Sequence, residues 1–280
     1  MADQNSTVLN FSAAGLMIAA HGSPSTPGGK TSTRRHAETI RKLGLFAEVK
    51  EAFLTEKPFV KDVLDTFETP EVFIVPNLAC AGYVSSNKLP QALGLTGPVT
   101  ERINANGHQR VFLCDPVGSD PGIVKIVAGR IAQGMAELNV PTDGTEVVMI
   151  GHGSQKSSAS FHCTINLIES LSEQGMELPL TSAFLEEPPF IESWRELTDA
   201  KTVVFVPYLI SDGYHGADEI PRDIGFNPKD EGFQERLKQG KPNEIELEGR
   251  RLVYLPPIGD APEMAELVLN QARAAQVENA

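Results

Sequence analysis

Short, almost uninterrupted runs of apolar residues alternate along the chain with longer stretches of helical period. Runs such as VVMI (147–150) and VVFV (203–206) are typical of strands buried on both faces of a parallel sheet. Helical patterns lie between the runs, for example over 122–138 and 262–275. This alternation predicts βαβ units and an α/β fold. The predicted strands are 16–20, 49–54, 72–75, 111–114, 147–150, 180–185, 203–206 and 252–255.

The chain also contains an internal repeat with an offset of 131 residues. AHGS around His21 returns as GHGS around His152, and AFLTEKPF at Ala52 returns as AFLEEPPF at Ala183. VFIVPNLACAGY and VVFVPYLISDGY match at the same offset. Three blocks in one ungapped register indicate a duplicated unit rather than chance similarity.

The repeat divides the chain into two four-stranded α/β halves, which we expect to cover residues 12–141 and 142–276. The turn-rich segment PTDGT joins them. CDPVGSDP of the first half resembles LPPIGDAP of the second, but this match comes about ten residues late. The second half therefore has an insertion, and the polar stretch 227–250 is expected to be an exposed excursion.

Composition narrows the class of protein. The formal net charge is −13, which argues against binding to nucleic acid. No apolar run reaches the roughly 18 residues that a membrane span needs. The first ten residues lack a basic cluster, so we expect a short disordered lead-in and no targeting peptide. The three cysteines show no Cys-x-x-Cys spacing, which favours a reducing, cytoplasmic location.

A comparison of the halves indicates where the chemistry lies. Only the second half has a set of three titratable groups after its first three strands: His152, Glu186 and His215. The corresponding residues of the first half are His21, Thr55 and Val84. The carboxyl ends of parallel strands share one edge of the sheet, and ligands bind at that edge. Two imidazoles and a carboxylate suit a transition-metal ion and can also accept protons.

These motifs resemble the class II chelatases, in particular the sirohydrochlorin cobaltochelatase and ferrochelatase group in its long, two-repeat form. GHGS, AFLEE-P and VPYLISDGYHGADEIP carry the resemblance, which covers nearly the whole chain. It implies two chelatase-like (flavodoxin-like) parallel-sheet domains that face a central cleft. It also implies insertion of Co(II), the favoured metal, or Fe(II) into a sirohydrochlorin-type tetrapyrrole, with no permanently bound cofactor.

The resemblance further assigns metal binding and deprotonation to His152, Glu186 and His215. Several long members of this group keep their working residues in the first half, whereas here Thr55 and Val84 replace two of them. The site is therefore expected in the second half.

A substrate with many carboxylates needs local cations despite the acidic average. Candidate substrate-binding residues follow strand ends: His21, Lys30, Arg34, Lys156 and Arg222, with Arg35 and Lys88 as further cations. The loop 24–33 is expected to be a mobile lid over the cleft.

Other readings of the motifs are weaker. GGKTST is not a phosphate-binding loop, because Pro24 stands where the pattern needs glycine. GHGS is not a nucleophile elbow, because Gln155 and Lys156 follow Ser154. His36, His108 and His162 are expected to be structural or exposed to solvent. A non-catalytic carrier or sensor of metal or tetrapyrrole stays open as the alternative function.

Overall fold

Two five-stranded sheets, one from each repeat, form the framework of the protein in a computed structural model that describes residues 10–23, 30–210 and 213–279. The first sheet contains β1 (Ala14–Ala20), β2 (Glu48–Phe53), β3 (Glu71–Pro76), β4 (Val99–Asn104) and β5 (Gly107–Leu113). The second contains β6 (Thr145–Gly151), β7 (Leu180–Phe184), β8 (Thr202–Pro207), β9 (Asn243–Leu247) and β10 (Arg250–Tyr254). The expected α/β fold in two repeated halves is confirmed.

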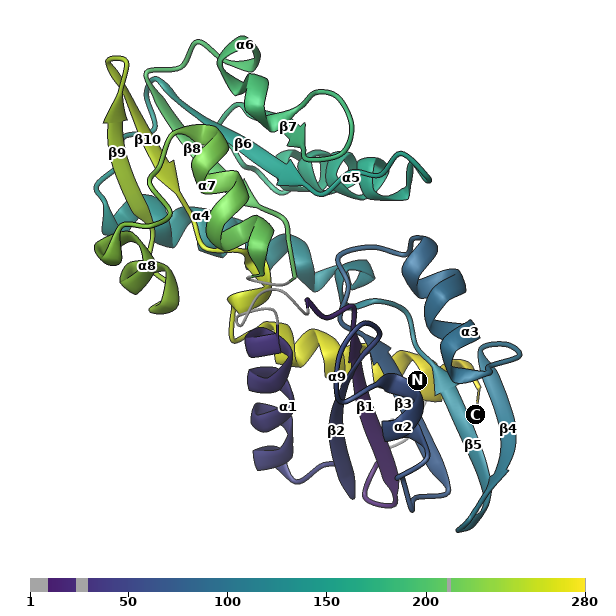
Figure 1. Cartoon of the computed structure of the whole chain (residues 1–280). Coiled ribbons are helices and arrows are strands. Elements are labelled where there is room, and N and C mark those ends of the chain that lie inside the picture. Colours follow the sequence, from purple (N-terminus) through teal and green to yellow (C-terminus); the bar gives the residue numbers. More distant parts are fainter. Residues whose placement is uncertain (1–9, 24–29, 211–212, 280) are drawn as a thin grey trace, which may run out of the picture.

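Helices connect and cover the strands (Figure 1). Those of the first half are α1 (Thr31–Leu43), α2 (Val60–Leu64), α3 (Leu89–Leu93) and α4 (Gly122–Glu137). Those of the second half are α5 (Ala159–Glu173), α6 (Trp194–Leu197), α7 (Ile220–Ile224), α8 (Glu231–Lys238) and α9 (Met264–Glu278). None of the helices in the described ranges has the length and apolar character that crossing a membrane requires.

The two sheets have the same topology, with strand orders β2-β1-β3-β5-β4 and β7-β6-β8-β10-β9. Each predicted strand overlaps a strand of the structure, and these strands pair in parallel. The prediction of four strands for each half was incomplete, because β4 and β9 add antiparallel edges. Their sequences, VTERIN and NEIEL, each contain two apolar residues that are not adjacent, so they form no apolar run.

The insertion 227–250 is more ordered than the exposed excursion that its polar sequence predicts. It contains α8 and β9 and the start of β10. The Asp230 carboxylate caps α8 by accepting a hydrogen bond of 2.8 Å from the Phe233 amide. Phe233 and Leu237 then bury one face of α8 against the second sheet. A single buried face on a mostly charged helix explains why composition alone indicated an excursion.

The last helix of each half reaches over to the other half. The C-terminal helix α9 packs on α1 and β3 of the first half, and Figure 1 shows it crossing that sheet. In the opposite direction, α4 packs on α5, and the Arg130 guanidinium donates to the Gly240 carbonyl at 3.3 Å. The halves therefore exchange their final helices, while the two sheets lie within 12–141 and 142–276.

This exchange gives the protein a core that both halves share. Leu16 and Ile18 of β1 belong to one apolar cluster with Val147 and Met149 of β6, together with residues of α4 and α9. The intervening residues of each strand point to the opposite face and belong to separate clusters. Each sheet is thus buried on both faces, as its continuous apolar runs predict.

The carboxyl ends of the two sheets meet at the junction between the halves. The Ser32 hydroxyl at the start of α1 donates to the Ile210 carbonyl, which follows β8, at 3.1 Å. At the same positions of the repeat, the Cys163 thiol of α5 donates to the Ala79 carbonyl, which follows β3, at 3.2 Å. Both contacts join a helix that follows a central strand to a loop at the opposite sheet's edge.

The expectation that residues 24–33 form a mobile lid is wrong for their last part. Thr31, Ser32 and Thr33 form the first turn of α1, and Ser32 and Thr33 are buried at the junction. Residues 24–29 lie outside the described residues, as do residues 1–9, where a lead-in was expected.

Candidate functional site

His152 is held at the carboxyl end of β6 by a tightly bonded loop. Its backbone carbonyl accepts hydrogen bonds from the amides of Leu185 and Glu186, at 3.2 and 3.0 Å, which fasten the loop to the end of β7. Gly153 has φ +75°, a left-handed conformation that glycine adopts without strain. The next amide, of Ser154, donates to the Glu187 carboxylate at 2.9 Å. The GHGS motif therefore fixes the direction of a half-buried imidazole.

His215 meets His152 from the neighbouring strand. It begins the π-helical turn His215–Glu219 after β8, a rare conformation that is frequent at functional sites. The centroids of the two imidazole rings are 4.9 Å apart, and their planes are nearly perpendicular at 86°. The His152 Nδ1 lies 3.0 Å from the Gly153 carbonyl, and the His215 Nδ1 contacts the Glu219 carboxylate. The sequence-based prediction thus selected two residues that the fold brings together.

Glu186 follows the end of β7, and its side chain is exposed. Its amide donates to the His152 carbonyl, which fixes its backbone next to the first motif. Across residues 10–23, 30–210 and 213–279, no three His, Cys, Asp or Glu side chains are grouped so as to hold a metal ion. In the described part of the chain, the two imidazoles are therefore close together, and the Glu186 carboxylate is not grouped with them.

The first half builds the same loop without the same chemistry. The His21 Nδ1 lies 3.0 Å from the Gly22 carbonyl, as in the second half, but this histidine is exposed. Where the second half has Glu186, the Thr55 hydroxyl donates to the His21 carbonyl at 2.9 Å. Val84 begins a matching π-helical turn, Val84–Lys88. The backbone of the site is thus duplicated, whereas its second imidazole is present in the second half alone.

Glu56 and Glu187 occupy one position of the repeat and hold their loops in the same way. The Ser23 amide donates to Glu56 at 2.7 Å, which matches the bond from Ser154 to Glu187. Burial alone would raise the pKa of Glu56, but hydrogen bonds from Lys30 and Ser23 outweigh burial and lower it. These two carboxylates support the loops of both halves.

The predicted substrate-binding cations differ in whether a carboxylate partner already pairs with them. The Lys30 ammonium is paired with Glu56 at 2.5 Å, and the Arg222 guanidinium lies 2.8 Å from Asp218. Arg34 is exposed, with Glu51 at 4.0 Å. Lys156, two residues after Ser154 of the GHGS loop, is exposed and has no ion-pair partner among the described residues. Of these four cations, Lys156 is thus the one that no ion pair holds within the described residues.

The remaining histidines have the structural or exposed roles that the sequence predicts. His36 is buried and its Nε2 lies 2.8 Å from the Gly259 carbonyl, across the junction. Burial lowers the pKa of His36, so the neutral ring is favoured. His108 pairs with Glu101 at the surface, and the Nδ1 of exposed His162 contacts the Ser158 carbonyl.

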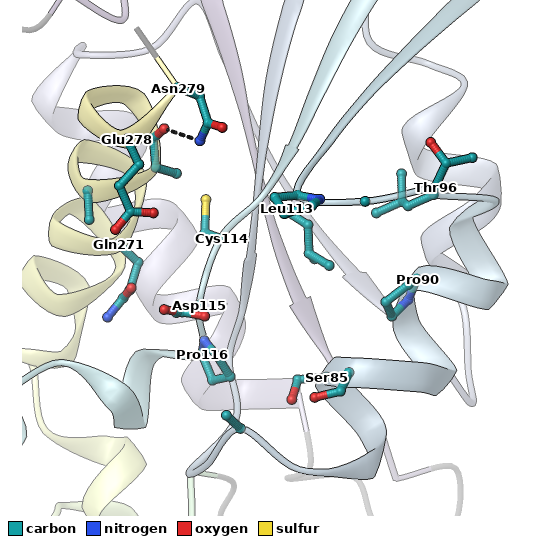
Figure 2. Close-up of a pocket in the computed structure, with 17 residues that line it drawn as sticks. Ser85, Pro90, Thr96, Leu113, Cys114, Asp115, Pro116, Gln271, Glu278 and Asn279 are labelled. Carbon is teal, nitrogen blue, oxygen red and sulfur yellow. Dashed lines mark hydrogen bonds between the residues drawn. The ribbon is translucent and has the colours of Figure 1, made fainter.

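A cavity of 510 Å³ lies in the first half, away from the two histidines. Figure 2 shows Gln271 and Glu278 of α9, followed by Asn279, on one side and Pro90 and Thr96 on the other, with Cys114 and Asp115 between them. In the matching region of the second half, the aromatic rings of Phe226, Phe233 and Tyr254 pack against one another and occupy the space. Smaller residues and the missing counterpart of α8 leave the space open in the first half.

Sequence reasoning missed Glu219, the contact partner of His215. The signal was present, because Glu219 lies four residues after His215 and residues at that spacing are neighbours on a helical turn. The comparison of halves, extended by one turn, would have shown Lys88 at the equivalent position.

Comparisons with known proteins agree with this architecture. The CbiX family model matches residues 15–134 and, a second time, residues 146–275. The chain is 27% identical over 272 residues to a probable sirohydrochlorin cobaltochelatase of Halobacterium salinarum, which covers 92% of this chain and 90% of that protein. It is 26% identical over 140 residues to a sirohydrochlorin cobaltochelatase of Methanopyrus kandleri, which covers 46% of this chain and 95% of the relative.

Solved structures share the fold. A multi-domain Deinococcus radiodurans protein with structural similarity to chelatases has a TM-score of 0.69 and 24% identity; the match covers 92% of this chain but only 54% of that protein. CbiX, described as the terminal enzyme of siroheme biosynthesis in denitrifying bacteria, has a TM-score of 0.63 and 24% identity, with 93% and 99% covered. SirB from Bacillus subtilis in complex with cobalt has a TM-score of 0.63 and 17% identity, with 94% of each chain covered. At these identities the likeness concerns the fold alone.

Proposed function

The chain belongs to the CbiX family, and we propose that it is a sirohydrochlorin chelatase that inserts Co(II), in preference to Fe(II), into a free-base tetrapyrrole. The observation that carries the proposal is the pair His152 and His215, whose rings lie 4.9 Å apart at the carboxyl edge of the second sheet. The Halobacterium relative, named a probable cobaltochelatase, supports the preference for cobalt. The product would enter cobalamin or, with iron, sirohaem biosynthesis, and we expect the reaction in the cytoplasm.

The reaction exchanges two pyrrole N–H protons for one divalent cation, and metal–nitrogen bonding drives it. His152 and His215 supply imidazole nitrogens that can ligate the incoming metal and accept protons. Glu186 has two possible roles beside them: it adds negative charge as a third ligand, or it relays protons outward from the histidines. We assign the reaction to the second half, 142–276, because the first half, 12–141, has Val84 in place of the second histidine.

The substrate's carboxylates need cations near the junction. Lys156 lies two residues after Ser154 of the GHGS loop, and Arg222 lies one turn beyond the π-helical turn of His215. From the first half we propose His21, Lys30 and Arg34, which lie at or after the end of β1. Binding energy from such contacts can be used to distort the flat macrocycle so that its nitrogen lone pairs become accessible.

A spectroscopic titration tests the proposal. Purified protein is mixed with excess free-base sirohydrochlorin and Co(II), Fe(II) or Ni(II), and the visible spectrum is followed. A chelatase converts many equivalents of substrate per protein, with Co(II) fastest. The alternative function, a carrier or sensor derived from a chelatase, gives a spectral change that stops at one equivalent.

A further inference from the structure

The His215 imidazole is in contact with the carboxylate of Glu219, which has no role in the reaction as proposed above. Its Nδ1 contacts the Glu219 carboxylate, four residues along the same π-helical turn. The side chain of Glu219 is 28% exposed and that of His215 is 42% exposed, so the carboxylate is the more enclosed partner. A neutral imidazole carries one N–H, and an acceptor at Nδ1 keeps the proton on that nitrogen. The lone pair of His215 is then on Nε2.

The first half shows that the backbone does not require this contact. Its π-helical turn Val84–Lys88 has the same length and leads into α3, as the turn His215–Glu219 leads into α7. Val84 and Lys88 stand where the second half has His215 and Glu219. Since the turn forms with valine and lysine, the histidine and its carboxylate have a purpose other than folding.

The neighbouring histidine, His152, also has its Nδ1 in contact with an acceptor. The His152 Nδ1 lies 3.0 Å from the Gly153 carbonyl, and a carbonyl can only accept, so this nitrogen is the donor. Both rings therefore have Nδ1 engaged, and neither Nε2 has a hydrogen-bond partner among the described residues. The two rings are packed edge to face, with their centroids 4.9 Å apart. The acceptor is a backbone carbonyl for His152 and a carboxylate for His215.

We propose that Glu219 is the positioning residue of His215: it holds the proton on Nδ1 and so offers the single lone pair of Nε2 either to the divalent metal or to a pyrrole proton. The inference rests on the proposed function for its purpose, although the orientation of the ring can be tested without turnover. A carboxylate behind a ligating histidine fixes its tautomer and raises its basicity, and removal of such a partner typically weakens metal binding about 10- to 100-fold.

The test compares substitutions at Glu219 with a matched control on the protein's surface. Glu219→Ala removes the acceptor, Glu219→Gln keeps an acceptor oxygen, and Glu219→Lys reproduces the residue of the first half. Glu101→Ala is the control, because it removes the carboxylate partner of the exposed His108 on β5, far from the site. Circular dichroism and thermal melting establish that each variant folds.

Two measurements report on positioning. Long-range ¹H–¹⁵N NMR of the histidine rings should show His215 protonated on Nδ1 in the unsubstituted protein. The proton should shift toward Nε2 in Glu219→Ala and Glu219→Lys, with Glu219→Gln intermediate. Titration with Co(II) alone should give a Kd about 10- to 100-fold weaker for Glu219→Ala, partial recovery in Glu219→Gln and no change in Glu101→Ala. Sirohydrochlorin binding without metal should be unaffected.

Unchanged ring protonation and Co(II) affinity in Glu219→Ala would overturn the proposal. If that variant fails to fold, Glu219→Lys decides the question, since the first half folds the same turn with a lysine. A protein that never turns over sirohydrochlorin, yet shows the shift at His215, would contradict the proposed function and leave the role of Glu219 standing.

Discussion

At the scale of single residues, the chemistry that we propose depends on Nε2 of the two imidazoles. His152 and His215 both have Nδ1 occupied, so two Nε2 atoms are available for a metal ion or for protons. The Glu186 side chain is exposed, whereas its neighbour Glu187 accepts a hydrogen bond from the Ser154 amide. Of these two adjacent carboxylates, Glu187 supports the loop, and Glu186 is the one that the proposed function assigns to the reaction.

Glu186→Gln should slow metal insertion about 10²- to 10⁴-fold and leave tetrapyrrole binding nearly intact, because it removes the charge and the base but keeps the size. Steady-state rates at several Co(II) concentrations distinguish the two roles. Partial rescue by high Co(II) indicates a metal ligand, whereas no rescue indicates a proton relay. Glu187→Gln, which keeps an acceptor for Ser154, should be mild. A Glu186→Gln variant with unaltered rates would leave a two-histidine site.

The sequence located His152 and His215 because both follow strands of one parallel sheet, whose ends share an edge. The direction in which a side chain points is set by tertiary contacts, and this is why the exposure of Glu186 was not predictable. Glu219 was overlooked for a different reason, since a helical turn full of charged residues looks like a solvated surface.

At the scale of elements, two glycines allow loops to meet at the junction. A Cβ on Gly118 would lie 1.9 Å from the Ala79 carbonyl oxygen, and one on Gly259 would lie 2.0 Å from that of Ile210. Both contacts are with backbone, which cannot rotate away. These equivalent positions hold the loops after β3 and β8 against the turns that follow β5 and β10.

Gly118→Ala should therefore lower the free energy of unfolding by about 3 kcal/mol, the upper range for overpacking in a rigid core. Urea denaturation measures the effect. The control is Gly129→Ala on α4, where an added Cβ meets nothing within 4 Å and should stabilise the helix by about 0.5–1 kcal/mol. Equal free energies of unfolding for the two variants would contradict this prediction, because they would show that the loops can move apart to accept the added Cβ.

The strands that are buried on both faces could be predicted from the sequence. The buried strands produce apolar runs, and the repeat places each of them twice. The edge strands β4 and β9 and helix α8 bury one narrow face each, so their sequences resemble loops. Their structure depends on partners distant in sequence, such as the apolar cluster that receives Phe233.

At the scale of the whole molecule, the exchange of α4 and α9 makes the halves interdependent. One apolar cluster contains residues of β1, β6, α4 and α9, so neither sheet is covered on both faces without the other half. Similarity within a repeat cannot reveal such an exchange, because a helix has the same sequence pattern whichever sheet it covers.

The shared core predicts a single unfolding transition. The chain has one tryptophan, Trp194, which is buried in the second half, so its fluorescence reports on that half. Far-ultraviolet circular dichroism reports on both halves. The two urea curves should coincide, with one midpoint. A second transition visible only by circular dichroism would indicate that the first half unfolds independently.

The central claim is that one of two similar halves performs metal insertion, and the rates of equivalent histidine variants test it most directly. Insertion of Co(II) into free-base sirohydrochlorin is compared for the unsubstituted protein, His152→Ala, His215→Ala and His21→Ala. We predict many turnovers for the unsubstituted protein, losses of about 10²- to 10⁴-fold for the two second-half variants, and most of the activity for His21→Ala. Equal damage from His21→Ala would contradict the account, because the reaction would then need both halves.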